Sequence, residues 1–123
     1  MTAMRNPLAP HIDFAELIGV IPHNPKFLPS NLDMVLERKG KFLVGEWKRP
    51  SESISRGQEI LLQNLSSIGF IVLVIEGNTD EQMIVNRIQI LTNAGLDDVG
   101  ESVEDLKNII RNWYEWADTR VRR

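Results

Sequence analysis

The sequence contains no cysteine, which excludes a disulfide framework, a zinc site built on thiolates and a cysteine nucleophile. Its two histidines, His11 and His23, lie too far from other ligand-type residues to predict an imidazole metal site. No apolar run approaches the roughly 18 residues that a membrane-spanning helix needs, and residues 1–10 lack the pattern of a secretory signal peptide. These absences favour a protein of the reducing cytoplasm that does not contact a membrane.

The composition predicts a single globular domain over residues 1–123, because 42% of the residues are hydrophobic, enough for a packed core. The net charge of -3 argues against nonspecific binding of nucleic acid by charge alone. Lysine and arginine gather in residues 37–56 and 107–123, however, whereas acidic residues gather in 76–106. This distribution is compatible with a cationic face and also with an ordinary surface of mixed charge.

The first half of the chain reads as a loop followed by a β-hairpin. Five of the six prolines lie in the first 31 residues, which indicates mostly loop, with one short helix over Asp13–Ile18. Leu32–Arg38 and Lys41–Lys48 have the composition of strands, and Lys39-Gly40 between them is a turn signal.

A helix and a buried strand are expected next. Ser55 followed by Gln58 has the spacing of a capping box, and Gly69 is a typical helix end. The continuous apolar run Phe70–Ile75 is typical of a strand that is buried on both faces. The order strand, helix, strand implies that this strand lies parallel to the second strand of the hairpin.

Two further helices are predicted in the C-terminal part of the chain, residues 79–123. Thr79 with Gln82 begins a helix over Asp80–Ala94, which Gly95 ends. Ser102 with Asp105 begins the second, which extends to about Asp118. The predicted fold class is therefore α/β, with a mixed β-sheet flanked by helices and two additional C-terminal helices.

The predicted hairpin brings acidic residues together. A two-residue turn at Lys39-Gly40 sets Asp33 opposite Glu46 on one face of the sheet, and Lys48 shares that face. Opposed carboxylates beside an apolar helix destabilise a fold, and a cation such as Mg²⁺ between them would resolve the conflict. Taken singly, Glu46 and Lys48 could also form a solvated strand edge, and Asp33 could be a turn residue.

The helix contributes one more candidate, Gln58. It lies on the first helical turn, on the stripe that Leu61, Leu62 and Leu65 share. An amide on a buried face needs a polar partner, and the acids of the sheet could supply one. The alternative is that Gln58 serves only the capping box.

Two short segments, SNLD at residues 30–33 and EWK at 46–48, resemble the motif of the PD-(D/E)XK nuclease superfamily. The stretch EWKRPSESISRGQEILLQNLSSIGFIVLVIEG is similar to the VRR-NUC branch and, more loosely, to small phage and archaeal Holliday-junction resolvases. The resemblance covers about residues 29–77 and implies a restriction-endonuclease-like core. It departs from the family at Leu32, where the motif has proline, and in its opening helix, where only Glu16 could supply the usual acid.

The resemblance implies a role for each residue of the motif. Asp33, Glu46 and the backbone carbonyl of Trp47 would bind Mg²⁺, with Mn²⁺ as a substitute. Lys48 would be the catalytic lysine, and Gln58 would support the metal or the attacking water. The implied reaction is metal-assisted hydrolysis of a phosphodiester bond.

The resemblance also implies a substrate and an assembly. We expect a structure-specific endonuclease that resolves branched DNA such as Holliday junctions during recombination, acting as a homodimer in a bacterial or phage-infected cell. Two alternatives remain: a flap, nick or duplex nuclease of the same fold, and a non-catalytic DNA-binding or assembly module. In the tail Trp113–Arg123, we expect Trp113 in the core, and Tyr114 and Trp116 available for dimerisation or DNA contact.

Overall fold

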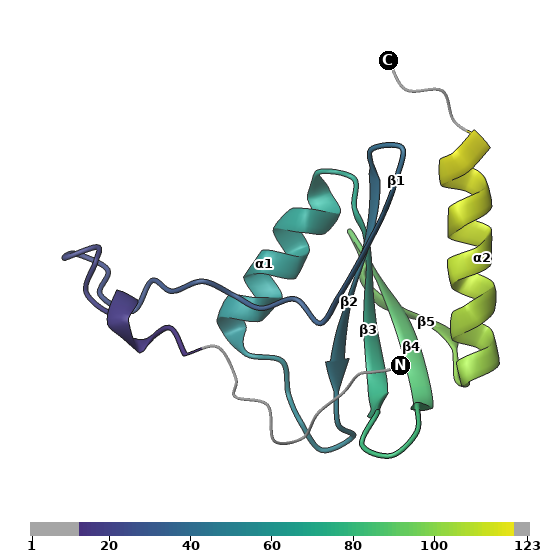
Figure 1. The fold of residues 1–123 in the computed structure, drawn as a ribbon, viewed down its shortest axis with the longest axis horizontal. Helices are drawn as coiled ribbons and strands as arrows, with labels where there is room; N and C mark the ends of the chain where they lie inside the picture. The colour runs from purple at the N-terminus through teal and green to yellow at the C-terminus, as the bar shows by residue number, and fades with distance from the viewer. Residues whose placement is uncertain (1–12, 120–123) are drawn as a thin grey trace. The chain divides into compact units, whose positions relative to one another are not determined.

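The computed structural model describes residues 13–119, and the chain forms two compact units that divide between Asn31 and Leu32. The described part of the first unit consists of turns and irregular chain with one short 3-10 helix, η1 (Ala15–Leu17), within the segment predicted to be helical. Glu16 lies in η1 and is exposed. The second unit carries the sheet and the helices α1 and α2 (Figure 1).

The second unit is built on a five-stranded mixed sheet, so the α/β class predicted from the sequence is confirmed. The strands lie in sequence order across the sheet. Strands β2 and β3 are parallel, and every other neighbouring pair is antiparallel. The strands are β1 (Met34–Arg38), β2 (Lys41–Lys48), β3 (Ile71–Asn78), β4 (Ile84–Thr92) and β5 (Gly95–Gly100).

The two helices cover opposite faces of the sheet (Figure 1). Helix α1 (Arg56–Ser67) connects β2 to β3, and α2 (Val103–Thr119) follows β5. Side chains alternate between the faces along each strand, so each helix packs on its own apolar layer. The layer under α1 contains Val44, Leu62, Val72 and Val74. The layer under α2 contains Leu43, Leu73, Ile75, Val85, Ile88, Leu106, Trp113 and Ala117.

The hairpin β1–β2 has the predicted turn and register. Lys39 and Gly40 have φ angles of 53° and 81°, as a tight two-residue hairpin turn requires. Arg38 pairs with Lys41, and Met34, at the start of β1, pairs with Gly45. The cross-strand pairing derived from the sequence is therefore confirmed.

The capping signals of α1 are also confirmed. The Ser55 hydroxyl accepts a hydrogen bond from the backbone N–H of Gln58 at 3.2 Å, which satisfies one free donor of the first turn. At the other end, Gly69 has a φ of 105°, a left-handed conformation that glycine adopts without strain. The chain then enters β3 beside β2.

The helix predicted over Asp80–Ala94 is wrong. This segment forms β4 and the turn into β5, so the C-terminal part contains one α-helix among the described residues instead of two. Five of the nine residues 84–92 are β-branched, and such side chains favour strands. Gly95, interpreted as a helix end, has a φ of 117° and pairs with Thr92 across the new hairpin.

The last helix agrees with the sequence prediction. The Ser102 hydroxyl accepts the backbone N–H of Asp105 at 3.1 Å, and α2 begins at the next residue after Ser102. Trp113 is 7% exposed and belongs to the core, as predicted. No helix within residues 13–119 is long and apolar enough to cross a membrane.

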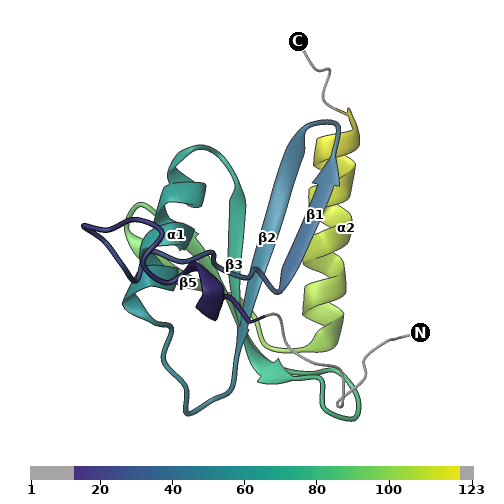
Figure 2. The same ribbon diagram turned by 60° about the vertical axis from the view of Figure 1, so that its left-hand side comes forward.

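The hairpin turn contacts the end of α2, and Figure 2 shows β1 beside this helix. Asp118 accepts a hydrogen bond from the Arg38 guanidinium at 2.8 Å. The Arg38 guanidinium also lies 5.1 Å from the centre of the exposed Tyr114 ring. Near them, the Lys41 ammonium lies 5.7 Å from the centre of the exposed Trp116 ring. The basic residues of the tail, Arg120, Arg122 and Arg123, lie outside the described residues.

Candidate functional site

The hairpin register places Asp33 and Glu46 at the same end of the β1–β2 pair. Met34 pairs with Gly45, so the next residues outward are Asp33 and Glu46. The Asp33 carboxylate accepts the backbone N–H of Trp47 at 2.9 Å, which ties the residue before β1 to β2. One carboxyl group therefore belongs to β2, and the other to the residue just before β1.

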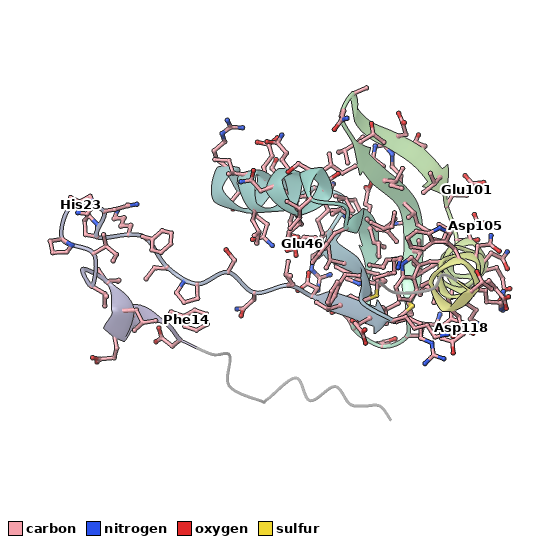
Figure 3. All side chains as sticks on the ribbon, turned by 90° about the horizontal axis from the view of Figure 1, so that it is seen from above. Phe14, His23, Glu46, Glu101, Asp105 and Asp118 are labelled. Atoms are coloured by element: carbon pink, nitrogen blue, oxygen red, sulfur yellow. The ribbon has the colours of Figure 1, made fainter. Side chains whose placement is uncertain are left out.

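Glu46 lies on the face of the sheet that carries α1 (Figure 3). Burial, reinforced by the negative charge of Asp33, raises the pKa of Glu46 from 4.5 to about 7, although a hydrogen bond from the Gln58 side chain acts in the opposite direction. Asp33, Glu46 and Gln58 thus interact as a group, although they come from the segment before β1, from β2 and from α1. Each of the three was a candidate from the sequence.

One oxygen of Glu46 is poorly satisfied. Its Oε1 is buried and has no hydrogen-bond partner among the described residues. A charged oxygen in this position loses its hydration and receives no donor in return, which is unfavourable. A proton stabilises the carboxyl group at this position, and a cation beside this oxygen would do the same.

The next two residues of β2 occupy different environments. The Trp47 side chain packs against the layer under α2, as the alternation of the strand predicts, so that only its backbone belongs to the candidate site. Lys48 returns to the face of Glu46, and its ammonium donates to the backbone carbonyl of Glu52 at 3.3 Å. The structure thus places Lys48 on the predicted face, next to the loop that leads into α1.

Sequence reasoning did not predict the contacts within the loop between β2 and α1. The Glu52 carboxylate accepts the backbone N–H of Arg49 at 2.8 Å, and this turn presents the carbonyl that Lys48 contacts. Arg49 in turn pairs with Asp80 at 2.8 Å. No spacing pattern in the sequence indicates these contacts, because they depend on the path of an irregular loop.

The donor set fits a hard cation that retains water ligands. Residues 13–119 contain no group of three or more histidine, aspartate or glutamate side chains arranged to hold a metal ion. Mg²⁺ does not need such a group, because one or two carboxylates with water and phosphate oxygens often complete its shell. Asp33 and Glu46, with its unsatisfied Oε1, have oxygen donors of this kind, and the Trp47 carbonyl would be the third.

The raised pKa of Glu46 predicts how the metal-free protein responds to pH. An unfolded chain loses the Glu46 proton near pH 4.5, whereas the folded protein holds it to about pH 7. The associated stability is present below the lower value and is lost as the pH rises through the higher one. Glu46→Gln, which is neutral throughout, is therefore expected to raise the melting temperature at about pH 8 and to have a much smaller effect at about pH 4.

Thermal denaturation in a chelating buffer measures this effect. Asp97→Asn removes an exposed carboxylate of β5 and serves as the control, since we expect no comparable gain at high pH. A Glu46→Gln melting shift that is equal at both pH values would contradict the assignment of the shifted pKa.

Comparisons of this chain with protein-family models, with curated proteins and with solved structures gave no match.

Proposed function

We propose that this protein is a Mg²⁺-dependent nuclease that hydrolyses phosphodiester bonds in DNA. The observation that carries the proposal is the convergence of Asp33 and Glu46, with a buried Glu46 oxygen that lacks a donor. This arrangement destabilises the fold when no cation is bound, and it suits the binding of a divalent cation. The resemblance of residues 29–77 to PD-(D/E)XK nucleases rests on the same two acids and on Lys48, and it implies the same function.

The residues of the site have distinct tasks in this reaction. Asp33, Glu46 and the Trp47 carbonyl would hold Mg²⁺, which activates water and neutralises charge on the phosphate. The Trp47 N–H orients the Asp33 carboxylate, and Gln58 orients Glu46 through its hydrogen bond. These contacts fix the two acids before the substrate arrives, so that little reorganisation is needed during the reaction.

Lys48 supplies a positive charge for the phosphate that is cleaved. Its present partner is a neutral carbonyl at 3.3 Å, a long and weak hydrogen bond. A phosphate oxygen is a stronger acceptor, because both partners are then charged. We therefore expect Lys48 to leave Glu52 and to bind the scissile phosphate.

A more specific proposal, that the protein is a homodimer that resolves branched DNA, rests on the resemblance to PD-(D/E)XK nucleases. Paired cuts in a four-way junction require two sites related by twofold symmetry. The exposed rings of Tyr114 and Trp116, with Arg38 and Lys41 beside them, offer a surface either for the second subunit or for DNA. A bacterial or phage-infected cell is the setting that this assignment implies.

A panel of labelled DNAs tests the proposed function: a four-way junction, a flap, a nicked duplex and a linear duplex, each with Mg²⁺ or Mn²⁺. We expect symmetric cuts that are confined to the junction. Equal cleavage of all duplexes would agree with a nuclease but would contradict the preference for branched DNA. Tight binding without cleavage of any DNA, unchanged by Asp33→Ala, would instead identify a non-catalytic DNA-binding module.

A further inference from the structure

A pocket of about 480 Å³ lies on the α1 side of the sheet, between the helix and the hairpin β4–β5. Its apolar walls include Leu62 of α1, Val74 of β3, and Leu91 and Leu96 of the hairpin. The volume falls in the range of pockets that bind small organic groups, roughly 300–1,000 Å³. The hairpin that sequence reasoning missed supplies one side of this pocket.

The pocket begins next to the proposed catalytic residues. Val74, on its apolar wall, is the register partner of Glu46, and neighbouring strands lie about 4.8 Å apart. Lys48 also lines the pocket. A phosphate at Lys48 would therefore place an adjoining nucleotide at the pocket entrance.

We propose that this pocket binds a nucleobase turned out of the DNA stack beside the cleaved phosphate, and that it favours bases with an exocyclic amino group. This inference rests on the proposed nuclease function. The side chains of Leu62, Val74 and Leu91 suit the flat apolar faces of a base. Enzymes that modify a DNA base bind the extruded base in a pocket of this kind.

The polar lining favours a base over a second phosphate. Glu52 and Glu59 line the pocket together with Lys48, and one oxygen of each carboxylate is engaged, by the Arg49 N–H and by the Arg56 guanidinium. The lining still carries two negative charges against one positive charge, which disfavours a second anion. Gln63, one turn after Glu59 on α1, adds an amide with both donors and an acceptor. Carboxylate oxygens accept hydrogen bonds from the amino groups of adenine, cytosine and guanine. Thymine has no such group and offers only its ring N3–H as a donor, so we expect it to bind about tenfold more weakly, the equivalent of one lost hydrogen bond of about 1.4 kcal/mol.

Nuclear magnetic resonance of the metal-free protein tests the pocket without cleavage. We expect dAMP, dCMP and dGMP to shift the methyl signals of Leu62, Leu91 and Leu96, and dTMP to require about tenfold higher concentration. The sugar phosphate 2-deoxyribose 5-phosphate lacks the base and should leave these signals unchanged. Equal shifts from the sugar phosphate, or shifts centred on other residues, would overturn the base pocket.

Gln63→Trp provides the matched test. Position 63 is exposed on α1, so the larger side chain can fill the pocket without disturbing the core. We expect it to abolish the nucleotide shifts, whereas Asn64→Trp, an exposed neighbour outside the pocket lining, retains them. A protein that cleaves DNA but shows no nucleotide shifts would overturn this inference alone. Nucleotide shifts in a protein that cleaves none of the DNA panel would overturn the nuclease proposal and leave a nucleotide-binding pocket.

Discussion

Asp33→Asn is expected to slow DNA cleavage by at least about 10³-fold and to leave the fold intact. The asparagine oxygen can still accept the Trp47 N–H, so the hairpin end keeps its hydrogen bond. The substitution removes the negative charge that would bind Mg²⁺, and metal ions contribute several kcal/mol to such reactions. At 1.36 kcal/mol for each factor of ten, this loss corresponds to about three orders of magnitude. Initial rates on the preferred DNA of the panel measure it.

Asp97→Asn is the matched control for this experiment. It makes the same chemical change on an exposed position of β5, and we expect it to cleave at the wild-type rate. Circular dichroism and melting curves check that both variants are folded. Wild-type turnover by Asp33→Asn would show that the carboxylate pair is not the catalytic centre.

Gly77→Ala is expected to destabilise the protein by about 3 kcal/mol or more, or to prevent folding. Gly77 lies at the irregularity between β3 and β4, where the register shifts after Glu76. A Cβ atom there would lie 2.0 Å from the carbonyl oxygen of Ile84 and 3.1 Å from the Cα of Val85. These are backbone atoms of the paired strand, so they cannot move aside without disrupting the pairing.

Urea denaturation of Gly77→Ala against Gly57→Ala measures this effect. A Cβ at Gly57, in the first turn of α1, meets no atom within 4 Å, so we expect that variant to be at least as stable as the wild type. Equal stabilities of the two variants would mean that β4 does not approach β3 as closely as described.

The parts of the fold that could be predicted are those with local chemical signals. Lys39-Gly40 sets the hairpin turn, and the turn determines every pair along β1 and β2. Ser55 and Gly69 mark the ends of α1. Since Asp33 and Glu46 meet through that hairpin, their proximity followed from short-range information.

The hairpin β4–β5 could not be predicted in the same way. A capping pattern at Thr79 and Gln82 competed with the strand preference of residues 84–92, and pairing with β3 stabilises the strand. The pocket beside Lys48 depends on that hairpin and on the loop through Glu52, so the sequence did not predict it either. Contacts between distant segments leave no periodic trace in a sequence.

The two acids belong to segments with unequal protection against local opening. Glu46 lies on β2, which pairs with β1 on one side and β3 on the other. Asp33 precedes β1, which is an edge strand with a single neighbour. Edge segments detach more readily than interior strands when a protein is warmed. Moderate heating would therefore separate the carboxylates while most of the sheet persists, so the proposed metal site would be lost at a lower temperature than the fold.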